Sequence, residues 1–490
     1  MPQRPASTEV RSVFERTHDE WLRANRPDLA DRFTAELPGA RAAVLARLWG
    51  AIAREPLPGK VARPAAGTVE FAHTTVAGPA AAAEPFAVAT AGLTVGGEES
   101  PGALAAALWP DRPAFAAELD NSVANLALAR AAHLRVRPPH DLADAEQSIV
   151  DGHPLHPCCR TRTGMTVADV VAYAPEHRPT VALPVIAVPP DRWTSTGAGL
   201  PPRLVMHPWQ WARVRDDHPW LEDSGERRFA RPLMSLRTLA TADAHVKTAV
   251  TAGMTSATRT VSAAALHNGP VLSAFLREMP GPRVLAERAG GAVLVDGEPS
   301  RHLAMIVRDA PRVTPGERAV PVAALTTTGD PVTFLGQLAA ILLPPLFALL
   351  ELGIALEAHG QNLIAVTASG RPRRLLYRDF GGVRVSPAAL TRNGIDPPPL
   401  RGDVACDDPA ELRAKVLASA VSTVLAGLVA QLVRARGVEP DRLWAAVAPH
   451  CPGWLRRLDA LPVKAMTAMR LAGTVDDIWT TVPNPLAGHP

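Results

Sequence analysis

The pattern of hydrophobic and polar positions changes twice along the chain. In the first 140 residues, which are rich in alanine and leucine, apolar positions recur with helical spacing, for example at 13–37 and 118–135. From about 145 to 330, short β-type runs separated by turn residues predict an antiparallel sheet with inserted helices. The last third returns to helical patterns. This order predicts an α+β fold without an internal repeat.

Short apolar runs define the predicted strands of the middle region. They lie at 180–188, 203–211, 232–241, 245–251, 292–298 and 303–309. We expect a helical domain over 1–140, a strand-rich domain over 141–335 and a C-terminal domain over 336–490.

The C-terminal third contains one long apolar run, 334–366. Pro344 and Pro345 divide it and two glutamates interrupt its second half, so a buried helix pair is favoured over a membrane span. Further on, Asp408 and Pro409 are a typical cap and first residue for a long helix over 409–435.

Composition narrows the function classes. The 490 residues contain 51 Lys and Arg against 48 Asp and Glu, a net charge of +3. That excess gives no reason to expect a nucleic-acid or membrane partner. Four cysteines do not make a disulfide scaffold, and no apolar segment typical of a secretory signal is visible near the N-terminus. We expect a cytoplasmic protein.

The stretch "DGHPLHPCCRTRTGM" (151–165) is the first candidate for chemistry. The adjacent cysteines, Cys158 and Cys159, do not have the spacing of a structural zinc site, and vicinal cysteines form strained disulfides. Two histidines (His153, His156) and two arginines (Arg160, Arg162) on a proline-stiffened loop suit an anion instead. An ordinary surface loop is the alternative.

A second candidate is "LMSLRTLATADAHVKTAVT" (233–251), which is typical of two strands and a turn. Ser235 and Arg237 would share one face of the first strand. A turn centred near Ala242 would place Arg237 opposite Lys247, and two cations kept opposite each other indicate an anion between them. Two solvated cations on an exposed face are the alternative.

The next stretch, "GMTSATRTVS" (253–262), predicts a helix start at Thr255 and Ser256. Arg259 would lie one turn further along, so that a hydroxyl and a guanidinium face the same way and can clamp a carboxylate or phosphate. The common glycine-rich phosphate loops are absent from the sequence.

The last candidate is "LEAHGQNLIAVTASGRPRRLLYRDFGGVRV" (356–385), a predicted hairpin with its turn near Gly370. Its pairing would bring Asn362 near Asp379 and crowd polar side chains at one end. These side chains are Glu357, His359, Gln361, Asn362, Arg378 and Asp379. Carboxylate and amide oxygens suit Mg²⁺, and the glycines at 381–382 allow a close backbone approach.

Taken in order over about 145–480, these motifs resemble the IucA/IucC family, siderophore synthetases of the aerobactin-synthetase type that work without a nonribosomal assembly line. The motifs are "GHPLHPCCRTRTG", "HPWQW", "SLRT", "VKTAV", "TSATR", "EAHGQN" and "RDFGG". The resemblance implies a cupped-hand shape with a helical thumb, antiparallel-sheet fingers and a mixed α/β palm. It also implies a homodimer.

The resemblance implies an ATP-dependent ligase that activates citrate or a related polycarboxylate as an acyl-adenylate. An amine, hydroxylamine or alcohol then attacks to give an amide or ester. ATP contacts are implied for His153, Arg160, Ser235, Arg237, Thr238, Lys247, Arg259 and Asp379. Contacts to the substrate carboxylate are implied for Thr255, Arg259, His359, Gln361, Lys464 and Arg470. Arg259, His359 and Lys247 would act in catalysis, and Glu357, Asn362 and Asp379 would hold Mg²⁺.

One departure from the family pattern is Arg160, where lysine is usual, and a second is the shorter chain. Both bear on substrate identity more than on reaction type. The alternatives are a ligase of the same mechanism that makes another natural product, a non-catalytic scaffold, and a ferric-siderophore reductase or iron-binding module. A reductase would need a cysteine cluster that Cys406 and Cys451 do not supply by themselves.

Overall fold

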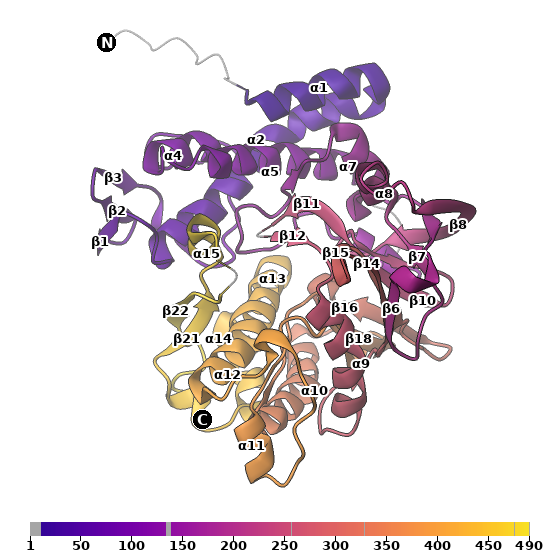
Figure 1. The fold of residues 1–490 in the computed structure, drawn as a ribbon. Helices are drawn as coiled ribbons and strands as arrows, with labels where there is room; N and C mark the ends of the chain where they lie inside the picture. Colours follow the sequence, from indigo (N-terminus) through magenta and orange to yellow (C-terminus); the bar gives the residue numbers. More distant parts are fainter. Residues whose placement is uncertain (1–10, 134–138, 256, 328, 475, 490) are drawn as a thin grey trace.

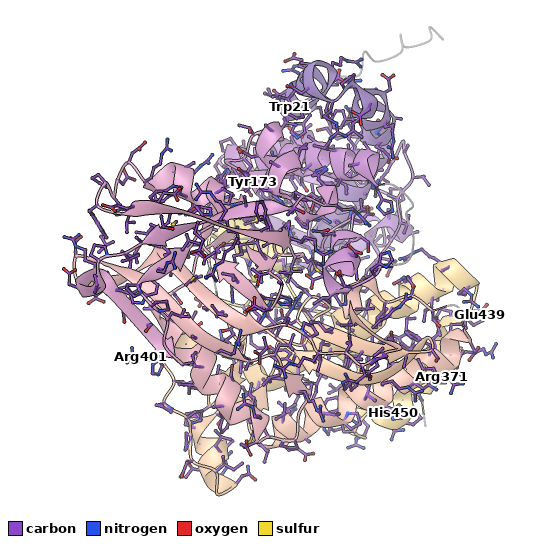
Figure 2. The ribbon with its side chains drawn as sticks, turned by 90° about the vertical axis from the view of Figure 1, so that its right-hand side faces the viewer. Trp21, Tyr173, Arg371, Arg401, Glu439 and His450 are labelled. Atoms are coloured by element: carbon purple, nitrogen blue, oxygen red, sulfur yellow. The ribbon has the colours of Figure 1, made fainter. Side chains whose placement is uncertain are left out.

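The computed structural model describes residues 11–133, 139–255, 257–327, 329–474 and 476–489 (Figure 1). The mixed α+β class predicted from the sequence is confirmed. In Figure 1, helices of the N-terminal region lie at the top, the strand-rich middle region lies at the right, and the C-terminal helices lie below. Figure 2 shows the long strands crossing the middle of the molecule between these two helical regions.

The N-terminal region is mostly helical, as predicted, but it also contains a small sheet that the sequence analysis did not predict. Its elements are α1 (Val13–Asn25), α2 (Pro27–Arg54), β1 (Lys60–Ala65), β2 (Thr68–Phe71), β3 (Thr74–Ala77), α3 (Ala80–Ala83), α4 (Pro101–Leu108) and α5 (Pro113–Ala132). The helical pattern over 13–37 divides at Arg26, because the proline that follows disfavours helical geometry there. Helices α2 and α5 pack on each other around Trp49 and Leu119.

The middle region contains an eight-stranded antiparallel sheet in the order β6-β14-β15-β10-β9-β8-β5-β7. Its strands are β5 (Val181–Ala187), β6 (Trp193–Gly197), β7 (Arg203–Val205), β8 (Glu222–Pro232), β9 (Thr238–Ala240), β10 (Ala244–Thr248), β14 (Glu287–Val295) and β15 (Glu298–Asp309). A three-stranded sheet lies beside it, made of β4 (Arg162–Thr163), β11 (Val250–Met254) and β12 (Ala257–Arg259). The helices are α6 (Leu142–Gln147), α7 (Val167–Tyr173), α8 (Pro208–Val214) and α9 (Ala263–Arg277).

Two predicted strands of this region are shorter than expected. The run 203–211 leaves β7 and continues as α8, because His207 caps the helix and Pro208 occupies its first position. The run 232–241 is a strand only at Pro232, where β8 ends, and in β9, since Leu236 between them adopts a left-handed backbone conformation (φ 65) that interrupts extended geometry.

The predicted break of the long apolar run is wrong. Helix α10 (Pro331–Glu351) passes through Pro344 and Pro345 without ending. Its buried side chains, among them Leu335, Leu338 and Leu343, lie in the largest core cluster, and this packing holds the helix together despite the missing backbone donors.

The second long helix begins at Asp408 and Pro409 as predicted, and the Asp408 carboxylate accepts from the Ala410 amide at 2.8 Å. It runs as α12 (Pro409–Val416), a π-helical segment (Leu417–Leu425) and α13 (Ala426–Arg436). By length and composition, this helix and α10 could each cross a membrane. Both contribute side chains to the C-terminal core, and core helices pass the same test.

The predicted hairpin forms β18 (Leu363–Ala368) and β19 (Arg371–Tyr377), with Ser369 and Gly370 in left-handed conformations at the turn. Its register pairs Leu363 with Tyr377, one position from the predicted register. The hairpin belongs to a four-stranded sheet in the order β13-β19-β18-β16, to which the middle region contributes β13 (Arg283–Val284) and β16 (Glu317–Pro321). The other C-terminal elements are α11 (Pro387–Arg392), α14 (Pro440–Val447), α15 (Met466–Ala472), β17 (Ile354–Ala355), β20 (Arg384–Val385), β21 (Ala460–Lys464) and β22 (Trp479–Pro483).

The "HPWQW" motif explains how the short β11–β12 hairpin is held. The fully buried Gln210 on α8 accepts two hydrogen bonds with Oε1, from the amide and the hydroxyl of Thr251, each 3.0 Å long.

We predict that Gln210→Leu lowers the free energy of unfolding by about 1–3 kcal/mol, because two donors lose their acceptor. Urea denaturation measures this change. Thr251→Val, which keeps the amide bond, should cost less, and equal costs would contradict this account.

Candidate functional site

A cavity of about 760 Å³ lies where the three regions meet. Of the described residues that line it, nine are Lys or Arg and four are Asp or Glu. The cations are Arg47, Arg130, Arg160, Arg162, Arg237, Arg259, Lys415, Arg434 and Lys464, and the acids are Asp151, Glu357, Asp379 and Asp477. Removing like charges from water together is unfavourable. This excess of cations therefore indicates a site for a multiply charged anion.

Strained backbone is concentrated at the cavity wall. Thr255 (φ 56), Asp379 (φ 72) and Phe86 (φ 63) line the cavity, and Leu236 (φ 65) lies between two lining residues. Left-handed geometry is costly for threonine, leucine and phenylalanine, and such outliers cluster at functional sites.

The ion pair between Lys247 and Asp379 joins the large sheet to the end of β19. Nζ of Lys247 lies 2.9 Å from Oδ1 of Asp379, and Glu287 lies on the other side at 3.8 Å. Burial alone would raise the pKa of Asp379, but Lys247, Arg237 and Arg308 together hold it below its ordinary value.

The predicted pairing of Arg237 with Lys247 is wrong by one residue. Lys247 pairs with Thr238, and the Arg237 carbonyl accepts from the Thr248 amide at 2.9 Å instead. The register differs because the turn is centred between Ala242 and Asp243, where the Thr241 amide donates to the Ala244 carbonyl at 2.9 Å. Arg237 still reaches the cavity, and although burial lowers its pKa to about 10 it stays cationic at neutral pH.

Thr255 and Arg259 do not lie on a helix, so the helix start predicted for 253–262 is wrong. Thr255 is at the turn of the β11–β12 hairpin and Arg259 lies in β12, paired with Val250. Both nevertheless line the cavity. Nη1 of Arg237 donates to the Thr260 carbonyl at 2.7 Å, which ties the hairpin to the other cation. Ser256 is outside the described residues.

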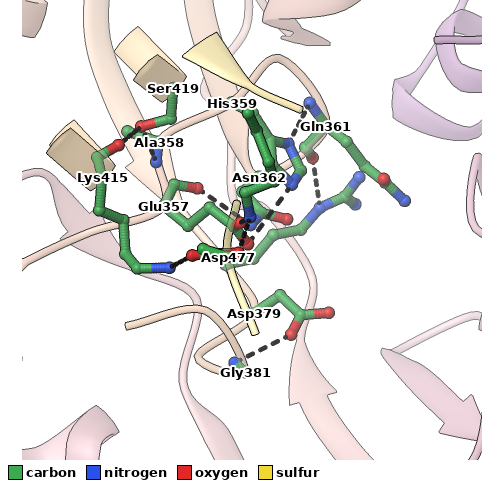
Figure 3. A network of polar contacts seen from close by, with 12 residues as sticks. Glu357, Ala358, His359, Gln361, Asn362, Asp379, Gly381, Lys415, Ser419 and Asp477 are labelled. Atoms are coloured by element: carbon green, nitrogen blue, oxygen red, sulfur yellow. Dashed lines mark hydrogen bonds and ion pairs between the residues drawn. The ribbon is translucent and has the colours of Figure 1, made fainter. Parts of the chain in front are cut away.

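The third cluster lies at the end of the β18–β19 hairpin, where the sequence placed it (Figure 3). Oε1 of Glu357 accepts from Lys464 Nζ at 2.8 Å, and Lys464 also contacts Asp477 at 2.8 Å. Burial alone would raise the pKa of Glu357, but Lys464 and His359 together bring it to about 2. Gly382 allows this carboxylate to lie against the chain, since a Cβ there would come within 2.1 Å of Oε2.

His359 is held as a neutral hydrogen-bond donor. Its Nδ1 accepts from the Gln361 amide at 3.3 Å, so the neutral ring carries its proton on Nε2. Burial lowers the pKa of His359, and Glu357 opposes that shift only in part. His153 has the same arrangement, with Nδ1 accepting from Leu155 at 3.2 Å and burial lowering its pKa to about 3.

Two of the predicted magnesium ligands, Glu357 and Asp379, are carboxylates of this cavity, and Asn362 lies beside them. Each carboxylate already contacts a lysine, and both hydrogen bonds to Asp379 use Oδ1. Oδ2 of Asp379 is therefore its oxygen available to a cation. Among the described residues, no group of three or more His, Cys, Asp and Glu side chains is arranged to hold a metal ion.

Most predicted site residues line the cavity, but four differ from expectation. Thr238 borders a small adjacent pocket of about 10 Å³, and Lys247 lies behind Asp379. Arg470 forms an ion pair with Glu118 of α5 and is not a lining residue. Arg160 lines the cavity but donates to the carbonyls of Ile149 and Val150 and to Glu176, so the protein itself uses its guanidinium.

The structure adds residues that the sequence reading missed. Arg308 on β15 is 2% exposed, its side chain makes no hydrogen bond to any described residue, and it borders the small pocket with Asp379. Lys415 and Asp477 form a buried pair at 2.6 Å behind Lys464. The available signal was a charged residue next to an apolar run, since Arg308 follows the apolar residues 303–307 and Lys415 precedes the apolar residues 416–418.

The cysteines are packing residues in this structure. Cys158 and Cys159 are buried in the N-terminal core, Cys451 is buried in the C-terminal core, and all four cysteines are free thiols.

Comparison with known proteins gives two family matches. The IucA / IucC family matches residues 141–200 and 202–327, and a family described as "Ferric iron reductase FhuF-like transporter" matches 332–486. The chain is 28% identical to staphyloferrin A synthase of Staphylococcus aureus over 52% of this chain and 55% of that protein. It is 27% identical to aerobactin synthase of Escherichia coli over 49% and 55%. The chain thus spans about half the length of the curated relatives it matches.

Solved structures share the fold across nearly the whole chain. The petrobactin biosynthesis protein AsbB from Bacillus anthracis matches with a TM-score of 0.75 at 19% identity, covering 97% of this chain and 98% of that one. ATP-bound aerobactin synthetase IucA from Klebsiella pneumoniae matches with a TM-score of 0.71 at 18% identity, covering 92% and 99%. The chain thus matches the IucA / IucC family over residues 141–200 and 202–327 and a FhuF-like family over residues 332–486, within a fold that the solved structures share.

Proposed function

We propose that this protein is an ATP-dependent ligase of siderophore biosynthesis, which joins citrate or a related polycarboxylate to an amine, hydroxylamine or alcohol. The observation that carries the proposal is the cavity with nine cationic and four acidic lining residues among those described. ATP and a polycarboxylate together bring at least six negative charges, which the excess of five cations and one Mg²⁺ ion would together balance. We also propose that the enzyme is a cytoplasmic homodimer.

The reaction would proceed in two steps. A carboxylate oxygen of the substrate attacks the α-phosphorus of ATP, the bond to the β-phosphate bridging oxygen breaks, and pyrophosphate leaves. The nucleophile then attacks the acyl carbon, the bond to the AMP oxygen breaks, and the nucleophile loses a proton. The products are an amide or ester, AMP and pyrophosphate.

The nucleotide end of the site would be formed by Ser235, Arg237, Lys247 and Arg308. The positive charges of Arg237, Lys247 and Arg308 are fixed by packing before any ligand arrives, so they can stabilise the charge that builds on the phosphates without reorganising. Glu357 and Asp379 would hold Mg²⁺, with Asn362 beside them, and the ion would neutralise phosphate charge.

The carboxylate end would be formed by Thr255, Arg259, His359 and Lys464. Arg259 supplies a planar fork that matches a carboxylate, and His359 supplies the Nε2 proton. A ring that donates from Nε2 and accepts from the chain with Nδ1 is suited to binding a carboxylate and not to removing a proton from the nucleophile.

The FhuF-like match raises iron reduction as a second candidate. An iron–sulfur centre of the usual kind takes four thiolates. The matched region contains only Cys406 and Cys451, and the other two cysteines of the chain are buried in the N-terminal core. The thiolates for such a centre are therefore not supplied by this region, so the ligase is the better supported function.

The proposed function is tested by incubating the protein with ATP, Mg²⁺ and a panel of carboxylates, among them citrate, 2-oxoglutarate and succinyl-hydroxamates. Amines are added next, and pyrophosphate and product mass are followed. We expect carboxylate-dependent pyrophosphate release. A well-folded protein that releases none with any carboxylate would refute the ligase assignment.

Arg259→Ala and Lys247→Ala should each slow adenylation on the order of 10²-fold or more, the loss expected for one transition-state charge contact. The control is Arg301→Ala, an exposed arginine that contacts Thr260 outside the cavity and should leave the rate unchanged. Because Lys247 is buried, Lys247→Met is a second variant that preserves packing. Near-normal adenylation rates for both the Arg259 and the Lys247 variants would contradict the assignment of these residues to the site.

His359→Ala should raise the KM for the carboxylate about tenfold or more, since one hydrogen bond to a charged group is worth about 1.5–3 kcal/mol, while His359→Gln keeps a donor and should lose less. Burial lowers the pKa of His359 below its ordinary value, so the ring is neutral at pH 7 and above. The ratio of kcat/KM between the wild type and His359→Gln should therefore stay constant from pH 7 to 9. A ratio that changes tenfold across this range would show that His359 titrates and acts as an acid or base.

A further inference from the structure

The segment from β21 through α15 to β22 passes from one hydrophobic core to another. Leu461 of β21 packs in the C-terminal core, whereas Ala465 and Ala468 are buried in the N-terminal core. Figure 1 shows α15 against the N-terminal helices, with β21 and β22 below it beside the C-terminal helices. Lys464, the last residue of β21, lies at the crossing between the two cores. The position of this lysine therefore depends on how both cores hold the segment.

Lys464 is the charged residue that this segment brings into the cavity. Its Nζ lies 2.8 Å from Oε1 of Glu357 and 2.8 Å from Oδ1 of Asp477. The Lys464 side chain is 26% exposed, so a ligand in the cavity can also reach the ammonium group. Beyond Lys464 the chain enters α15 within two residues. A movement of α15 against the N-terminal region would therefore move the backbone that carries Lys464.

Glu55, which follows the last residue of α2, holds the start of α15. It is 4% exposed, and its Oε2 accepts from the Ala468 amide at 2.8 Å, across 413 residues of sequence. The amides of a first helical turn have no acceptor within their own helix, and Ala465, at the cap position of α15, has no polar side chain to offer one. Glu55 thus supplies from the N-terminal region an acceptor that α15 itself lacks.

Two further contacts fix the same segment to the N-terminal region. The Thr480 hydroxyl in β22 donates to the Arg54 carbonyl at 2.7 Å, one residue before Glu55. Arg470, in the second half of α15, forms an ion pair with Glu118 of α5. Of these three anchors, the one made by Glu55 acts nearest to Lys464 along the chain, four residues further on.

The burial of Glu55 is unfavourable in itself. Burial raises the pKa of its carboxyl to about 7, and the hydrogen bond from the Ala468 amide opposes this shift only in part. A glutamine would accept the same hydrogen bond without placing an ionisable group in the core. Substitution by glutamine therefore keeps the acceptor and removes the charge, whereas substitution by alanine removes both.

We infer that Glu55 is a positioning residue for the carboxylate site: by holding α15 on the N-terminal region, it sets where Lys464 meets the substrate. This inference rests on the proposed function and adds a residue to its first half-reaction. Glu55 does not line the cavity, so it would not touch a reacting atom. Its effect would reach the substrate through α15 and Lys464, and the nucleotide end, which other elements form, would be unaffected.

The test measures ATP–pyrophosphate exchange against the concentration of citrate, or of the panel carboxylate that gives the fastest exchange, and separately against ATP. We expect Glu55→Ala to raise the KM for the carboxylate about tenfold or more, because a buried amide loses its acceptor and Lys464 loses its fixed position. The KM for ATP and the kcat should stay within about threefold of the wild type. Glu55→Gln should bring the KM for the carboxylate back to within about threefold.

A double-mutant cycle separates positioning from a general loss of stability. Lys464→Met should raise the same KM, and adding Glu55→Ala to it should change that KM less than about twofold, since both substitutions act on one contact. The matched control is Asp31→Ala, which removes a carboxylate that is 95% exposed on the same helix and should leave both KM values unchanged. Effects that multiply in the double variant would show that Glu55 supports the fold only.

The inference is overturned if Glu55→Ala leaves the KM for the carboxylate within about threefold of the wild type, raises both KM values equally, or is not rescued by Glu55→Gln. If Glu55→Ala does not fold, Glu55→Asp takes its place in every comparison, because its shorter side chain withdraws the acceptor by one carbon.

Failure of the proposed function would be seen separately, as no pyrophosphate exchange by the wild type with any carboxylate. In that case amide hydrogen exchange decides the inference. Loss of the Glu55 acceptor should speed exchange about tenfold or more both in 465–472 and in 357–362, where Lys464 makes its contact. Faster exchange confined to 465–472, or no change in either stretch, refutes the inference.

Discussion

The ion pair between Lys247 and Asp379 is the contact on which the site depends. It links the centre of the eight-stranded sheet to the end of the β18–β19 hairpin, 132 residues away in sequence. A buried lysine without its carboxylate would be strongly unfavourable. The pair therefore fixes how the middle and C-terminal regions meet, and it keeps the surrounding cations in place around one cavity.

The arrangement around this pair follows one physical rule. The cavity is lined by more cationic than acidic side chains, and each carboxylate interacts with more than one cation. Asp379 faces Lys247, Arg237 and Arg308, while Glu357 and Asp477 share Lys464. Folding thus leaves positive charge uncompensated in a place that water reaches poorly. An anionic ligand relieves that cost, and the strained backbone at Thr255 and Asp379 is consistent with a site shaped for binding at the expense of stability.

Within the cluster, hydrogen-bond partners distinguish side chains that are available to a ligand from side chains that support the fold. His359 and His153 use Nδ1 to accept from the chain, which leaves the Nε2 proton for a ligand. Arg160 and Arg470 resemble ligand-binding residues in sequence, but Arg160 is bound to Glu176 and two carbonyls, and Arg470 is bound to Glu118. The same residue type therefore serves recognition or support according to whether the protein already provides an anion.

The sequence by itself determined the local elements whose signals are short in range. The Asp408–Pro409 helix start, the hairpin with its turn at Gly370 and the antiparallel character of the middle region follow from caps, turn residues and alternation over a few positions. The polar cluster at Glu357–Asp379 followed from that hairpin. The prediction that depended on exact register, Arg237 opposite Lys247, failed because the turn is centred between Ala242 and Asp243 and not at Ala242, which moves every partner by one position. Only the tertiary structure decided that Thr255 and Arg259 lie on a hairpin, that α10 passes through two prolines, and that Lys464 reaches Glu357 across 107 residues. The reason is that these features arise from contacts between distant segments, whose energies are absent from any local stretch of the chain.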